Sequence, residues 1–172
     1  MPNSMIVIGI DSESRIMAGI FINQVFNVTN LEVTAIHNQL TALNFNADKI
    51  KIVTVNAMPE DALAKCISKE NESFYNSYMN VIYRHGERYV LGFRCEDPLV
   101  EHAIIKKGDL YFDPTLQANS DFTPYQYALL TEFKVFDMIK HAKSNKEFPP
   151  DIDYLLTKQK HFKNIINCNI DK

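Results

Sequence analysis

Cysteine is scarce in this sequence, and its spacing argues against two common ways of stabilising a small domain. The three cysteines, Cys66, Cys95 and Cys168, are an odd number and form no CxxC pair. A disulfide framework uses an even set, and a structural zinc site needs closely spaced thiols or histidines. The five histidines form no HxxxH or HxH pair either. We therefore expect reduced thiols, no metal and no cofactor.

A basic surface, a long apolar run and a glycine-rich phosphate loop are also lacking. The formal net charge is −3, and Lys and Arg are scattered singly or in pairs, so nucleic acid is not an expected partner. The apolar stretches 5–10 and 16–22 are far shorter than the roughly 20 residues that cross a bilayer. No conventional secretory signal is present. We expect synthesis in a cytoplasm and no membrane span, with delivery into a target cell by a non-classical route as an alternative.

The length and apolar content suit one folded core. A chain of 172 residues that is 46% hydrophobic can bury one core and is short for two ordinary domains. We expect a single domain over residues 1–172, in which residues 164–172 form a frayed tail.

The order of periodic segments predicts an α+β fold. The first half is expected to hold a strand followed by a hairpin partner or helix (5–10 and 16–26), a helix from Thr29 to about Phe45, a strand over 49–55 and a short helix after Pro59. The second half is expected to hold a helix from Ser73 to Tyr83, an antiparallel meander of strands 88–94, 100–105 and 110–112, a long helix from Thr123 to about Ala142 and a last helix near Asp151.

Three residues in this order predict nucleophilic acyl chemistry. Such chemistry needs a nucleophile beside an imidazole and a third polar group that orients the imidazole. Ser73 stands at the start of a predicted helix, where the helix dipole favours an ionised nucleophile. His102 lies on one strand of a predicted hairpin and Asp113 just past the other, with the turn at Gly108 between them. Antiparallel pairing should therefore bring these two side chains to one end of the sheet.

The same segments resemble a group of papain-like and transglutaminase-like proteins of bacteria and phages. That group's pattern runs Cys-aromatic-x-Asn-small, Tyr-Val-x-Gly-aromatic, His-Ala and Asp-Pro-Thr. This chain has Ser73-Phe-Tyr-Asn-Ser77, Tyr89-Val-Leu-Gly-Phe93, His102-Ala103 and Asp113-Pro-Thr115. The resemblance spans roughly residues 70 to 117 and implies an antiparallel sheet packed against a nucleophile-bearing helix, additional helices and a Cys-His-Asp triad.

The chain departs from this pattern at position 73, where serine stands in place of the cysteine nucleophile. A site tuned as a thiolate and imidazolium pair does not generally activate an alcohol, because the pKa of an alcohol is several units higher. Ser77, in the same nucleophile-aromatic-x-Asn register, and Cys66, near the end of its predicted helix, are fallback nucleophiles. Asn71 is a candidate oxyanion-hole donor beside the backbone N–H groups of the helix start.

The resemblance implies a cysteine-type hydrolase or acyltransferase that acts on an amide bond of a protein or peptide substrate. A protease, a deamidase, a transglutaminase and a peptidoglycan amidase all pass through an acyl-thioester with the same three groups, so all four stay open. Small size is compatible with an effector, a toxin or a phage-encoded enzyme. With serine at position 73 the chain is expected to be inactive, through a deliberate substitution or as a degenerate relative that acts as a binding module. Serine is also a preferred helix N-cap and Asp-Pro-Thr a common turn, so purely structural roles are the competing interpretation.

Overall fold

The computed structural model describes residues 5–10, 16–21, 30–119, 124–145 and 149–167. The chain divides into two compact units, Met1–Ala35 and Ile36–Lys172, where the sequence predicts one domain. In the first unit, β1 (Met5–Ile10) and β2 (Ile16–Phe21) pair as an antiparallel hairpin, which is one of the two arrangements expected there. The second unit carries every candidate site residue.

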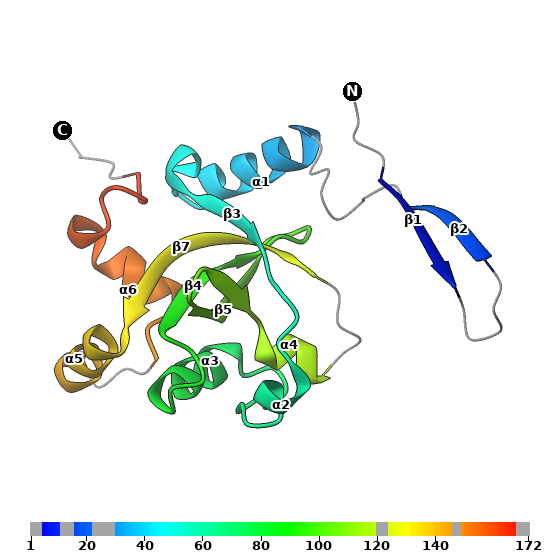
Figure 1. Cartoon of the computed structure of the whole chain (residues 1–172). Helices are drawn as coiled ribbons and strands as arrows, with labels where there is room; N and C mark the ends of the chain where they lie inside the picture. The colour runs from blue at the N-terminus through cyan, green and yellow to red at the C-terminus, as the bar shows by residue number, and fades with distance from the viewer. Residues whose placement is uncertain (1–4, 11–15, 22–29, 120–123, 146–148, 168–172) are drawn as a thin grey trace. The chain divides into compact units, whose positions relative to one another are not determined.

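A curled five-stranded sheet organises the larger unit (Figure 1). Its strand order is β3-β7-β4-β5-β6, and every neighbouring pair is antiparallel. The strands are β3 (Lys51–Thr54), β4 (Arg88–Arg94), β5 (Val100–Lys107), β6 (Leu110–Phe112) and β7 (Gln126–Lys134). The meander β4-β5-β6 is the one that the sequence predicts, and Gly108 supplies the positive φ of its second turn. The mixed α+β class is therefore confirmed.

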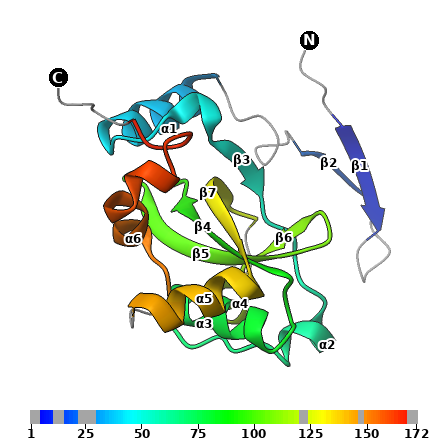
Figure 2. The ribbon, with the colours of Figure 1, turned by 90° about the vertical axis from the view of Figure 1, so that its left-hand side faces the viewer.

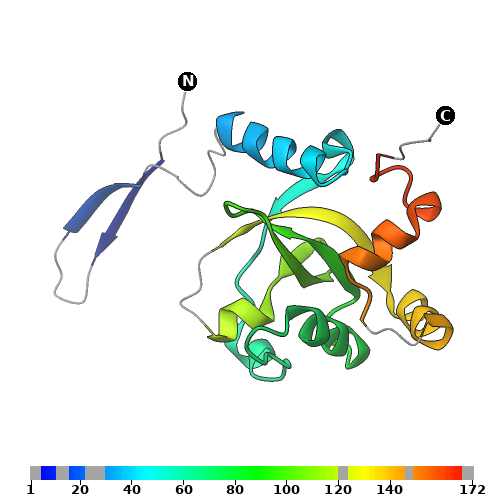
Figure 3. The ribbon, with the colours of Figure 1, turned by 180° about the vertical axis from the view of Figure 1, so that it is seen from behind.

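Helices occupy the segments between and after these strands. They are α1 (Asn30–Ala42), α2 (Glu60–Leu63), α3 (Ser73–Ile82), α4 (Pro114–Asn119), α5 (Val135–Asn145) and α6 (Ile152–Thr157), with short 3-10 turns at Ala47–Lys49 and Gln159–His161. Helix α3 packs against β5 and β4, and α4 packs against α3. Figures 2 and 3 show α3 and α4 on the same side of the sheet.

The sheet separates two apolar clusters. Alternate residues of β4 enter the larger cluster, Tyr89, Leu91 and Phe93, while Val90 enters a smaller one with Tyr127 on the other face. A strand that is buried on both faces needs apolar residues at successive positions rather than in alternation. The central strands β4 and β7 both contain runs of successive buried residues.

The predicted helix over 123–142 is wrong for most of its length. Residues 126–134 form β7, which pairs with β3 and β4, and only from Val135 does the chain become helical. The run Tyr127–Leu130 is buried throughout, and a continuous apolar run does not distinguish a buried strand from a buried helix. The predicted helix start at Thr123 lies outside the described residues.

The expected frayed tail is also wrong over its first residues. Ile165 and Ile166 are buried, and Ile166 forms an isolated antiparallel bridge with Phe45. The Asn167 side chain donates a hydrogen bond to the Phe45 carbonyl at 3.0 Å. Residues 168–172 lie outside the described part of the chain.

Among the described residues, no helix combines the length and the apolar character that spanning a membrane would require.

Candidate active site

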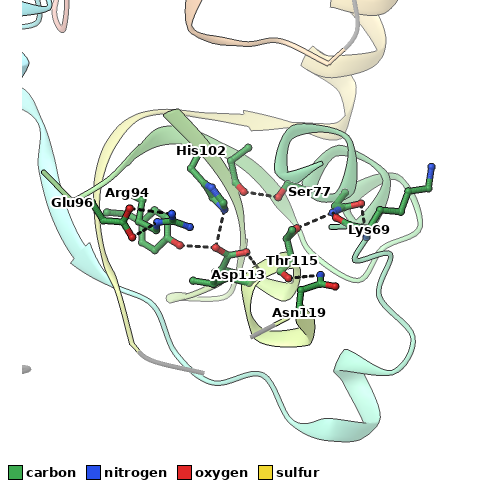
Figure 4. Close-up of polar contacts among 12 residues, drawn as sticks. Lys69, Ser77, Arg94, Glu96, His102, Asp113, Thr115 and Asn119 are labelled. Carbon is green, nitrogen blue, oxygen red and sulfur yellow. Dashed lines mark hydrogen bonds and ion pairs between the residues drawn. The ribbon is translucent and has the colours of Figure 1, made fainter. Parts of the chain in front are cut away.

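His102 and Asp113 meet at the end of the β5-β6 hairpin (Figure 4). His102 lies on β5 and is 8% exposed, and Asp113 directly follows β6 and is fully buried. The Nε2 atom of His102 lies 2.8 Å from Oδ2 of Asp113. Nε2 makes no well-aligned hydrogen bond to the carboxylate, and the two side chains form an ion pair when His102 is protonated. The spacing of the two residues around Gly108 predicts this contact.

Two further donors complete the surroundings of the Asp113 carboxylate. Oδ1 accepts the Leu116 backbone N–H at 2.9 Å, and Oδ2 accepts the Tyr127 hydroxyl at 2.5 Å. Burial by itself raises the pKa of Asp113, but the His102, Tyr127 and Leu116 contacts outweigh it, and the pKa falls below its ordinary value. Asp113 is therefore an ionised carboxylate at neutral pH.

The Asp113-Pro114 pair starts a helix that the sequence analysis missed. Pro114 was predicted to end the strand, with a turn at Asp-Pro-Thr as the competing interpretation, and α4 begins at Pro114. Proline suits the first helical position, and Asp113 acts as the N-cap through its bond to Leu116. One carboxylate thus caps α4 with one oxygen and faces His102 with the other.

Ser73 is the first residue of α3 and is 6% exposed. The predicted N-cap role is wrong, because Glu72 occupies that position and makes no side-chain capping bond. Ser73 therefore lies one residue into the helix, at the positive end of its dipole. The direct contact between the Ser73 hydroxyl and the His102 ring stays a prediction.

A pocket of about 300 Å³ brings Ser73, His102 and Asn71 to one surface. Its other lining residues come from the loop before α3, from α3 itself, from the ends of β4 and β5, and from α4: Glu70, Phe74, Arg94, Val100, Glu101, Thr115, Leu116 and Asn119. Asn71 has a positive φ of 58°, a conformation that asparagine tolerates better than most residues. The oxyanion-hole role of Asn71 stays a prediction.

Two buried asparagines of α3 hold the loop that leads to Ser73. Asn80 exchanges two hydrogen bonds with the backbone of Ile67, both of 2.8 Å. Asn76 accepts the Lys69 N–H at 3.1 Å and donates to the Lys69 carbonyl at 2.6 Å and to Thr115 Oγ1 at 3.0 Å. These asparagines, which lie three residues after Ser73 and Ser77, thus have a structural role. Both bind the loop to α3, and Asn76 also binds α3 to α4.

Neither fallback nucleophile lines this pocket. Ser77 is fully buried, and its hydroxyl donates to the Ala103 carbonyl at 2.8 Å on the sheet side of α3. Cys66 follows the end of α2, with its sulfur 3.4 Å from the Ala62 carbonyl oxygen, and burial raises the pKa of its thiol. Both are poor nucleophiles: the Ser77 hydroxyl is already bonded to the sheet, and the raised pKa of Cys66 disfavours the reactive thiolate.

The sequence analysis missed two neighbours of the His102–Asp113 pair, Tyr127 at the carboxylate and Arg94 in the pocket lining. They face each other across the β4-β7 pair, and Arg94 binds Glu96 at 2.8 and 3.1 Å. Burial by itself lowers the pKa of Arg94, and the bond and charge of Glu96 more than reverse that effect. The Arg-x-Glu spacing at a strand end was a usable signal for the ion pair. Tyr127 gave none, because its segment was interpreted as a helix.

Among the residues that the structure describes, no three or more His, Cys, Asp or Glu side chains gather in a group that could hold a metal ion.

Comparisons with protein families, with curated proteins and with solved structures found no match to this chain.

Proposed function

We propose that this site is that of a cysteine-type hydrolase or acyltransferase acting on an amide bond, on a papain-like or transglutaminase-like scaffold, in a form whose nucleophile position holds serine. The observation that carries the proposal is the buried His102–Asp113 pair, 2.8 Å apart, in a pocket that Ser73 also lines at the start of α3. A nucleophile position, an imidazole and an orienting carboxylate then come from three separate elements, as acyl transfer requires.

The proposed chemistry assigns one role to each group. With Nε2 of His102 toward Asp113, Nδ1 is the ring nitrogen left to take the proton of the nucleophile. The thiolate of a cysteine at position 73 adds to the amide carbonyl, and backbone N–H groups at the start of α3 stabilise the oxyanion, with Asn71 as an additional donor. The imidazolium returns the proton to the leaving amine, and a water or amine then takes the acyl group from sulfur.

The pocket has room for a side chain or a short stretch of peptide. Its volume of about 300 Å³ is at the lower end for small-molecule sites. A protein or peptide amide is thus the proposed substrate, and whether water or an amine accepts the acyl group separates protease, deamidase, transglutaminase and amidase. A secreted effector, a toxin or a phage-encoded enzyme is the proposed biological setting.

A binding module is the second candidate, and the serine at position 73 favours it. An alcohol at this position keeps the shape of the site and lacks the acidity of a thiol. A relative that has lost its thiol could retain the pocket for recognition of a peptide without cleaving it.

The Ser73→Cys variant tests the proposal through its rate of alkylation by iodoacetamide. A thiol at the start of α3 beside His102 should react faster than a free thiol well below about pH 8.5. Adding His102→Ala should slow the reaction more than adding Asp113→Ala, because only the first removes the charge partner of the thiolate.

The Ser77→Cys variant is the matched control, since it places a thiol one helical turn away and outside the pocket. Because iodoacetamide can also alkylate Cys66, Cys95 and Cys168, labelled peptides are counted by mass spectrometry. A Ser73→Cys thiol that reacts no faster than the Ser77→Cys thiol, and ignores the loss of His102, would leave the binding module as the better interpretation.

A further inference from the structure

We propose that Tyr127 is a positioning residue of this site, which fixes Oδ2 of Asp113 and moderates how strongly the carboxylate holds the His102 ring. The inference deepens the proposed function and rests on it for its catalytic meaning. Its geometric content concerns only the three side chains, so it can be tested in the chain as it stands.

The geometry places the phenol on the same carboxylate oxygen as the imidazole. Tyr127 donates to Oδ2 of Asp113 at 2.5 Å, while Nε2 of His102 lies 2.8 Å from that oxygen. The two rings lie 5.6 Å apart between centroids, at 54°. Tyr127 is 1% exposed on the central strand β7, and it does not line the pocket.

Asp113 is held in place without help from His102. The Leu116 N–H binds Oδ1 and the Tyr127 hydroxyl binds Oδ2, so the plane of the carboxylate is set by two donors. The histidine ring therefore meets an acceptor whose direction is already determined. This is the arrangement by which outer groups orient a reacting imidazole.

The Tyr127 hydroxyl can act here only as a donor. Burial and the neighbouring Asp113 charge raise the pKa of Tyr127 far above its ordinary value, so the phenol keeps its proton. A hydrogen bond to Oδ2 stabilises the charge on the carboxylate and so weakens its attraction for the protonated imidazole. Loss of the tyrosine donor should therefore strengthen the hold of Asp113 on protonated His102.

The Tyr127→Phe change alters none of the other charged residues near His102. They are Arg94 with Glu96 at the end of β4, and the pocket carboxylates Glu70 and Glu101.

The test follows the His102 ring titration by NMR in the unsubstituted chain and in Tyr127→Phe. The midpoint should rise by about half a pH unit to one unit, which corresponds to the net strength of one hydrogen bond. Tyr89→Phe is the matched control, because its buried hydroxyl also donates at 2.5 Å, to the Pro150 carbonyl, and it belongs to the larger apolar cluster rather than to that of Tyr127. Both variants should lower the melting temperature, and only Tyr127→Phe should move the midpoint.

Incorporation of 3-fluorotyrosine at position 127 gives a variant that keeps the packing and strengthens the donor. The midpoint should then move down instead of up. No movement in either variant beyond that of Tyr89→Phe, or movement with the opposite signs, would overturn the inference. A slow Ser73→Cys thiol together with the expected midpoint shifts would instead refute the proposed catalysis and leave the positioning role intact.

Discussion

Asp113 accepts the backbone N–H of Leu116 at 2.9 Å, so the residue that faces His102 is also the N-cap of α4. Asp113 therefore supplies the carboxylate that faces His102 and also caps α4, the helix that forms part of the pocket wall. Disturbing Asp113 should affect the site and the stability of this helix together.

Replacing Asp113 separates these two contributions. Asparagine is as good an N-cap as aspartate but lacks the charge, whereas alanine lacks both. We expect Asp113→Ala to lower the free energy of unfolding by about 0.5–2 kcal/mol more than Asp113→Asn does. Urea unfolding of the two variants measures the difference, and equal losses would mean that the bond to Leu116 contributes nothing.

Acid should destabilise the fold through Asp113. Because its folded-state pKa is lowered, its ionised form stabilises the fold at pH values above its unfolded-state pKa. That contribution should be lost as the pH falls from about 4 through the lowered folded-state pKa. Unfolding free energies measured between pH 6 and pH 2 should fall less steeply in Asp113→Asn than in the unsubstituted chain. Parallel curves would show that another carboxylate dominates the acid transition.

The Asn76 amide should be needed to hold the loop before Ser73. Asn76→Ala leaves the backbone N–H and carbonyl of Lys69 without their side-chain partner, at an expected cost of about 2–3 kcal/mol. Hydrogen exchange over residues 67–72 should quicken in the same variant. Asn38→Ala, at an exposed position of α1, is the control and should leave both measurements nearly unchanged.

Gly92 should tolerate no side chain. A Cβ there would lie 2.3 Å from the Ala128 carbonyl oxygen, at the irregular register where β4 meets β7. Gly92→Ala should therefore cost more than about 3 kcal/mol, since backbone rather than a flexible side chain must move. Gly108→Ala is the comparison, because nothing lies within 4 Å of its Cβ position and only its positive φ opposes the change, at about 1 kcal/mol. Thermal denaturation of both variants measures the contrast, and similar losses would contradict it.

The parts of the site that are close in sequence were predictable. The turn at Gly108 and the alternation of the flanking strands are local properties, and they placed His102 beside Asp113. The start of α3 at Ser73 was also predictable, although its cap was not, because the loop before it is held by asparagines from later turns of the same helix.

The sequence by itself determined the α+β class, the meander and the spacing of the His102–Asp113 pair, since each depends on periodicity and turn chemistry within a few residues. Only the tertiary structure decided that residues 126–134 enter the sheet between β3 and β4 and bring Tyr127 to the pair. That segment is apolar at successive positions, so its local pattern suits a helix and a buried strand equally. The choice came from two neighbouring strands whose backbone groups it satisfies, and such partners are separated from it by tens of residues in the chain.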